Sequence, residues 1–129
     1  MLFNKEKTEL IQYPIGNIST SYSIPNSVET IGDSAFDGCT FLTSVIIPGS
    51  VKSIGPSAFD GCTSLTSVTI PGSVKSIGGY AFYDCTSLTS VTIGNSVETI
   101  RSSAFRYCTS LATIIFETDT WNITSIGED

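Results

Sequence analysis

The sequence contains no histidine, and this absence removes several kinds of chemistry at once. Serine–histidine–aspartate triads, histidine-based acid–base catalysis and imidazole metal sites all require that side chain. Carboxylates remain as candidate catalysts. Asp37 and Asp60 are 23 residues apart and hold the same position in an internal repeat of this sequence. Because Tyr83 and Arg106 hold that position further along the chain, we interpret the two carboxylates as part of a solvated surface. We therefore predict that the chain is not an enzyme, with no catalytic residue.

Basic residues and long apolar runs are also scarce. Six lysines and arginines stand against twelve acidic residues, a net charge of −6, and the basic residues are scattered. Binding to nucleic acid or to an anionic membrane depends on clustered positive charge, so we predict neither partner. No apolar run reaches the length of a membrane-spanning helix. The first ten residues carry four charges and lack the apolar core of a signal peptide, so we expect a cytosolic chain, or a piece whose targeting segment lies elsewhere.

What the sequence has in abundance is self-similarity. The stretch from Ile47 to Val68 recurs almost letter for letter from Ile70 to Val91. The cysteines keep a step of 23 residues without slippage, and the recurring phenylalanines and alanines keep the same step. A fixed period in the range of about 20–50 residues marks a stack of similar units, each of which buries its apolar face against its neighbours. We predict a solenoid of coils of about 23 residues.

Each coil is predicted to contain two strands and a turn. The first strands are rich in threonine, valine and isoleucine, and most are closed by proline–glycine or similar turn residues: 20–24, 43–47, 66–70, 89–93 and 112–116. Second, shorter strands are expected at 28–31, 51–54, 74–77 and 97–100. Strand periodicity places Leu65, Val68 and Ile70 inside the coil, with Ser67 and Thr69 outside. Residues 57–62 are predicted to form one tight helical turn that glycine ends.

The two ends of the chain depart from the period. Residues 1–19 read as two short strands around a polar turn, and we interpret them as an N-terminal cap; a linker from an upstream domain is the alternative. The repeat array then covers residues 20–116. Residues 117–129 form an irregular partial repeat, in which 122–127 resembles 73–78 but arrives three residues late, after the only tryptophan, Trp121. We expect the last coil to be unfinished.

The repeated phrase carries a family resemblance. The pattern Leu65-x-x-Val68-x-Ile70-Pro71-x-x-Val74-x-x-Ile77-Gly78-x-x-Ala81-Phe82-x-x-Cys85 resembles the BspA-like leucine-rich repeats, also called the Treponema pallidum type. The resemblance implies an α/β repeat solenoid, right-handed and curved, with a concave parallel sheet and short helical turns. It also implies a cell-surface or secreted location, on bacteria or some parasitic protists, and a role in adhesion to host matrix proteins or other cells.

The candidate binding site is the exposed face of the first strands. Hydroxyl-bearing residues recur there in rows, with isoleucine at both ends of one row. An ordinary exposed sheet has the same composition, and a regular threonine array is also a feature of ice-binding solenoids, so these interpretations stay open beside a contact surface for a protein or glycan. The candidate concave face consists of Thr43, Ser44, Ile46, Thr66, Ser67, Thr69, Thr89, Ser90, Thr92, Thr113 and Ile115. A purely structural spacer is the alternative function.

The four cysteines, Cys39, Cys62, Cys85 and Cys108, suggest zinc at first sight. Equivalent atoms of successive coils lie about 4.8 Å apart, whereas a zinc site needs every sulfur about 2.3 Å from one ion. We therefore predict no metal and no cofactor, and a buried ladder of reduced thiols, although disulfides between adjacent coils stay open.

Cross-coil ion pairs are expected between Glu29 and Lys52 and between Lys75 and Glu98, each contributing about 0–1 kcal/mol. The expected partners are a protein or glycan ligand, together with end-to-end self-association of the stack.

Overall fold

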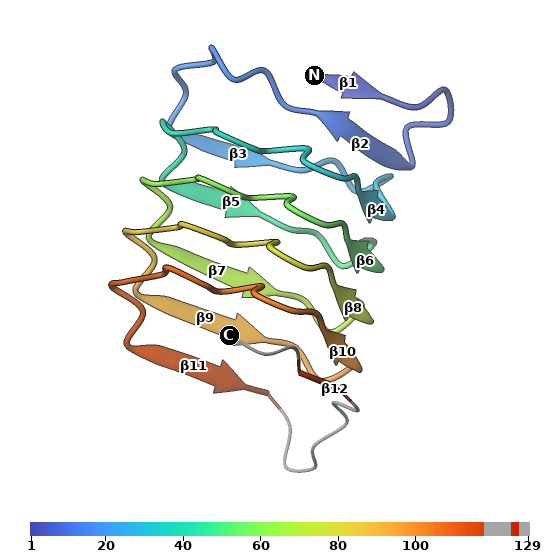
Figure 1. The fold of residues 1–129 in the computed structure, drawn as a ribbon. Helices are drawn as coiled ribbons and strands as arrows, with labels where there is room; N and C mark the ends of the chain where they lie inside the picture. The colour runs from blue at the N-terminus through green and yellow to red at the C-terminus, as the bar shows by residue number, and fades with distance from the viewer. Residues whose placement is uncertain (118–124, 127–129) are drawn as a thin grey trace.

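In the computed structural model, which describes residues 1–117 and 125–126, the chain forms a stack of coils with strands on two sides (Figure 1). One side is a seven-stranded sheet in the order β1-β2-β4-β6-β8-β10-β12. Its strands are β1 Leu2–Phe3, β2 Glu9–Gln12, β4 Thr30–Ile31, β6 Ser53–Ile54, β8 Ser76–Ile77, β10 Thr99–Ile100 and β12 Ser125–Ile126. The other side carries β3 Ser21–Ser23, β5 Ser44–Ile46, β7 Ser67–Ile70, β9 Ser90–Ile93 and β11 Thr113–Phe116.

The register of the strands confirms the 23-residue coil. On the seven-stranded side, Thr30 pairs with Ser53, Ser53 with Ser76 and Ser76 with Thr99, all in parallel. On the other side, β7, β9 and β11 form one parallel sheet and β3 pairs with β5 in another. The stack is therefore a β-solenoid in which each coil adds one strand to each side.

The core lies between the two sides and is built from rows of identical residues. Leu65, Val68 and Ile70 are buried, while Ser67 and Thr69 are exposed, as strand periodicity predicts. The phenylalanine rings stack almost parallel along the whole array, with centroid separations of 4.8 Å, 5.0 Å and 5.3 Å for the pairs Phe36–Phe59, Phe59–Phe82 and Phe82–Phe105. The apolar surface that a lone coil would expose is thus covered by the next coil.

The predicted helical turn is wrong. No helix occurs among the described residues, and residues 57–62 form a run of hydrogen-bonded turns with positive φ at Ser57 (56°) and Gly61 (72°). The N–H groups of Ala58, Asp60 and Cys62 bond to carbonyls three residues earlier in the same coil. The N–H groups of the alternate residues donate instead to carbonyls of the next coil. These bonds run from Ser57 to Gly79, from Phe59 to Ala81 and from Gly61 to Tyr83. A helix would use every N–H within its own coil, so the ladder between coils replaces the helix, and the helical part of the predicted α/β class is absent here.

The N-terminal strands expected around the polar turn are present, but their register differs from the period. β1 and β2 are antiparallel, and β2 continues the sheet as a parallel neighbour of β4, with Leu10 opposite Ile31. The period alone would have placed Thr8 there. The phase returns at Tyr13, which is buried and stacks on Phe36 at 5.2 Å. The hairpin therefore supplies a leucine and a tyrosine to the core rows of the array.

At the other end, β12 joins β10 with Ile126 opposite Ile100, a spacing of 26 residues. This register confirms the three-residue delay inferred from the sequence. Trp121 lies outside the described residues.

Candidate binding surfaces

The strand face, defined as the outer surface of β3, β5, β7, β9 and β11 together with the residue directly before each of β5, β7 and β9, carries all eleven residues of the predicted site. Ser90 and Thr92 are half-buried and the other nine are exposed. The pairing of β7, β9 and β11 aligns Thr69, Thr92 and Ile115 in one row and Ser67, Ser90 and Thr113 in another. The structure therefore brings these side chains together on one continuous side of the stack.

The row of Thr43, Thr66 and Thr89 has a structural role that the sequence did not reveal. The hydroxyl of each threonine donates a hydrogen bond to the backbone carbonyl of the threonine one coil earlier, over 3.0–3.3 Å. These bonds tie the coils together just before each strand begins. A ligand would therefore meet hydroxyl groups that already have an acceptor.

A hollow of about 370 Å³ interrupts the strand face where the hydrogen-bonded sheet divides between β5 and β7. Ile46 is 63% exposed there. Beneath it, Val45 and Ile47 are each 7% exposed, whereas the equivalent Ile70 of the next coil is fully covered. The hollow is lined by Ser44, Val45, Ile46, Ile47, Ser67 and Thr69.

A larger groove, of about 640 Å³, lies at the seven-stranded sheet. Its lining residues come from four successive coils and include Asp33, Pro56, Tyr80 and Arg101. This groove was not predicted from the sequence, because none of its positions stands out within a single coil. The available signal was that Tyr80 and Arg101 depart from the repeat, since other coils hold serine and glycine at these two positions.

Beside this groove, three tyrosines and an arginine form an aromatic cluster. The ring of Tyr83 lies 5.3 Å from that of Tyr80 and 5.2 Å from that of Tyr107, and the Arg106 guanidinium carbon is 4.9 Å from the Tyr107 ring centroid. Tyr80 and Tyr107 are 45% and 51% exposed. Aromatic and guanidinium groups in such contact form a stable, partly apolar surface.

The carboxylates lie along the turns. Asp37 is exposed and Asp60 is half-buried. Burial, followed by the negative charges of Asp37 and Asp84, raises the pKa of Asp60 above its usual value. Within residues 1–117 and 125–126, no three cysteine or carboxylate side chains gather in a way that could hold a metal ion.

All four cysteines are free thiols; three are buried and Cys108 is half-buried. The sulfurs of Cys62, Cys85 and Cys108 each donate to the carbonyl of the phenylalanine in the preceding coil, over 3.0–3.2 Å. Burial and then the Asp37 charge raise the pKa of Cys39 to about 11, and burial also raises the pKa of Cys62. These two thiols are thus held protonated and unreactive at neutral pH.

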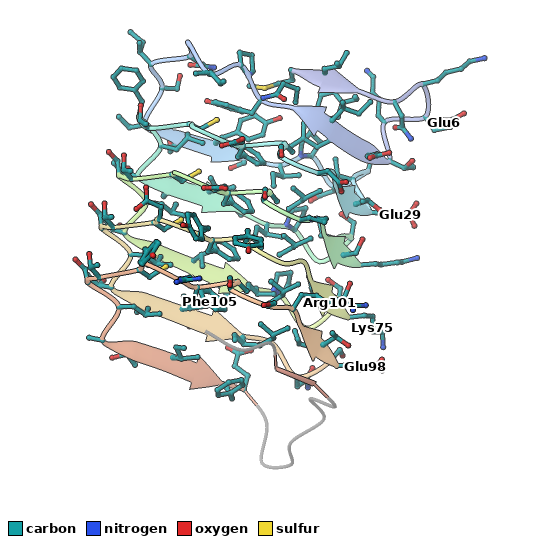
Figure 2. All side chains as sticks on the ribbon, in the orientation of Figure 1. Glu6, Glu29, Lys75, Glu98, Arg101 and Phe105 are labelled. Atoms are coloured by element: carbon teal, nitrogen blue, oxygen red, sulfur yellow. The ribbon has the colours of Figure 1, made fainter. Side chains whose placement is uncertain are left out.

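The predicted ion pair between Glu29 and Lys52 is confirmed, with an oxygen–nitrogen distance of 3.0 Å between exposed side chains. Lys75 and Glu98 lie at the equivalent place two coils further on, where the N–H of Glu98 donates a backbone hydrogen bond of 2.8 Å to the carbonyl of Lys75. Figure 2 shows Glu29, Lys75, Glu98 and Arg101 along one edge of the stack, near the seven-stranded sheet.

A stack of 23-residue coils with leucine, valine and isoleucine rows in the core and one parallel strand per coil on each side defines a leucine-rich-repeat solenoid. Within this class, the chain belongs to the BspA-type leucine-rich repeat region family, whose model matches residues 16–129 in six copies. None of the curated proteins compared with the chain matches it.

Several solved structures are similar. A leucine-rich repeat protein from Eubacterium ventriosum is 26% identical, with a TM-score of 0.75 over 88% of this chain and 37% of that protein. A leucine-rich cell surface protein from Faecalibacterium prausnitzii is 34% identical, with a TM-score of 0.67 over 94% of this chain and 38% of that protein. The leucine-rich repeat protein of T. pallidum is 31% identical, with a TM-score of 0.59 over 84% of this chain and 60% of that protein. The chain spans less than two thirds of each of these proteins.

Across the described residues, no helix is both long and apolar enough to cross a membrane.

Proposed function

We propose that the chain is a non-catalytic recognition module that binds a macromolecule through its strand face. The observation that carries this proposal is the hollow between β5 and β7, where Ile46 is 63% exposed beside a gap in the sheet. An exposed apolar side chain next to a hollow, surrounded by polar residues, has the organisation of a protein interface with an apolar centre and a polar rim. A protein ligand therefore fits this surface better than a glycan does.

The rest of the strand face supports the same function through rigidity. Backbone ladders and threonine hydroxyl bonds join each coil to the next. A surface that is already ordered loses little conformational entropy when a ligand binds. We take this sheet to be the concave side of a right-handed, curved stack, in line with the family resemblance.

A location on the cell surface or outside the cell is part of the proposal. It is supported by the similar protein from Faecalibacterium prausnitzii, which is described as a cell surface protein. Because this chain matches only 38% of that protein, the module would act as one segment of a longer molecule, with adhesion as the activity of the whole.

The test measures binding of the chain to a panel of extracellular matrix proteins and glycans by surface plasmon resonance, first with the unchanged chain. Ile46→Lys and the double change Thr69→Lys with Thr92→Lys should each weaken binding at least about tenfold, because charge would be buried at the contact. The melting temperature should change little, since Ile46 and Thr69 are exposed and Thr92 is half-buried on the outer side of the same sheet. Glu29→Lys, on the edge away from the strand face, is the control and should leave binding intact. If Glu29→Lys removes binding while the strand-face changes do not, the proposed face is wrong; if no panel member binds, the spacer role is favoured.

A further inference from the structure

The groove at the seven-stranded sheet passes two glycines that occupy the same position in successive coils, Gly55 and Gly78. A Cβ atom added at Gly78 would lie 2.5 Å from the backbone nitrogen of Pro56, and one added at Gly55 would lie 2.9 Å from the backbone nitrogen of Asp33. Both distances are shorter than real Cβ contacts, so a side chain does not fit at Gly55 or Gly78, whereas the next coil has Arg101 at this position. The groove is therefore lined here by Gly55 and Gly78, together with side chains from neighbouring positions of the same coils.

Along the sheet, the groove is lined by a row of hydroxyl groups. Thr30, Ser53 and Ser76 are half-buried and line the groove, and they come from three paired strands. Paired residues of neighbouring strands lie about 4.8 Å apart. This spacing is close to the length of one ring in a linear sugar chain, so successive sugars could each meet one hydroxyl.

One end of the groove carries Tyr80 and Arg101, the two residues that depart from the repeat. Tyr80 is 45% exposed, and its ring is held by contact with Tyr83. Its φ of 59° is close to those of the equivalent Ser34, Ser57 and Ser103, so the left-handed backbone belongs to the repeat, and here it carries a tyrosine ring in place of serine. Arg101 stands nearby, at the position that glycine occupies in the three preceding coils.

These features select among classes of ligand. β6 and β8 are each paired on both sides, so a peptide cannot add to the sheet as a further strand. The net charge of −6 opposes a polyanion. The groove combines hydroxyl groups that both donate and accept with the ring of Tyr80 and the charged groups of Asp33 and Arg101. Such a lining suits a ligand that is rich in hydroxyl groups and has apolar ring faces.

We propose that this groove binds a short, neutral, linear oligosaccharide. The Tyr80 ring packs against the face of one sugar, the hydroxyl groups of Ser53 and Ser76 exchange hydrogen bonds with the sugar hydroxyls, and Arg101 donates to an oxygen of the terminal unit. This site is separate from the strand face, and its existence does not depend on the function proposed for that face.

The test titrates the full chain with cellohexaose, xylohexaose and chitohexaose by calorimetry and by NMR of the amides that line the groove. At least one of these sugars should bind, and the amide shifts should fall on residues of β6, β8 and the turn before Tyr80. Tyr80→Ser should weaken binding at least about tenfold, and Arg101→Gly severalfold. Both changes restore residues that other coils hold at these positions, so the fold should be retained, as circular dichroism would show.

Phe41→Ser is the matched control. Phe41 is 49% exposed and stands where the other coils have serine, away from the groove. Its loss removes an aromatic side chain of similar fractional exposure and should leave the sugar affinity within about twofold of the original. The proposal is overturned if none of the three sugars binds, if Tyr80→Ser and Phe41→Ser bind equally well, or if an oligogalacturonate or an extended peptide shifts the groove amides while the neutral sugars do not. The lysine changes on the strand face leave sugar binding intact, which separates failure of one site from failure of the other.

Discussion

The Phe82 side chain is fully buried between two other phenylalanines, with ring centroids 5.0 Å from Phe59 and 5.3 Å from Phe105. Its chain neighbour Tyr83 is half-buried, and its ring contacts those of Tyr80 and Tyr107 in the surface cluster. The same backbone segment thus presents one aromatic residue to the core and the next to the surface. The difference arises from alternation along the turn, where every second N–H bonds to the next coil.

Replacing Phe82 by alanine should lower the free energy of unfolding by about 3–5 kcal/mol, because a cavity would remain in close-packed surroundings. Tyr83→Ala should cost much less. Urea unfolding followed by circular dichroism measures both values. Similar losses at the two positions would contradict the assigned inward and outward positions.

At the scale of the element, the turn and the short strand that precedes it are shaped by contact between coils. Gly78 closes the strand β8, and its N–H donates to the carbonyl of Ile54 in the preceding coil over 2.8 Å. The backbone at Pro56 lies directly against it. Gly49, in the turn between β5 and β6, has open space around it and no positive φ.

These two glycines provide a matched pair. Gly78→Ala should destabilise the chain by about 1–3 kcal/mol, because the new methyl group would press against backbone that cannot move aside. Gly49→Ala should change stability by no more than about 0.5 kcal/mol. Thermal unfolding of the two variants checks this, and equal melting temperatures would show that the coils are less closely packed than the structure indicates.

At the scale of the whole molecule, stability accumulates from coil to coil, since each coil contacts only its neighbours. Leu65 and Leu88 occupy the same repeat position in successive coils. The two halves of the stack on either side of such a coil therefore present matching surfaces. A coil can be removed without disturbing the rows of core residues only if the deletion spans one whole period.

Deleting residues 66–88, one full period, should give a chain that folds with a lower melting temperature, because one interface between coils is lost. Deleting residues 66–87 removes one residue fewer and should prevent cooperative folding. A one-residue slip turns every core side chain of the following strand to the outside. Circular dichroism and heteronuclear NMR spectra distinguish the two outcomes, and equally well-folded products would contradict the fixed 23-residue register.

The sequence by itself determined the period, the parallel pairing and the inward or outward direction of nearly every strand residue. These properties repeat identically in each coil, so a local pattern such as Leu65, Val68 and Ile70 already contains them. It also placed all eleven candidate residues on one exposed side, because alternation along a strand is a local property. The three-residue offset of β12 was likewise visible in the sequence, because residues 122–127 resemble 73–78 but come three residues later than the period requires.

Only the tertiary structure decided the features that depend on how coils meet. The turn at residues 57–62 resembled a helix locally, but half of its N–H groups find acceptors in the next coil. Leu10 replaced Thr8 opposite Ile31 because the N-terminal hairpin presents an apolar side chain to the core at that register. The hollow beside Ile46 and the groove beside Tyr80 combine residues 23 or more positions apart. Such sites depend on how residues of different coils are arranged in space, and this arrangement cannot be read from the sequence of one coil.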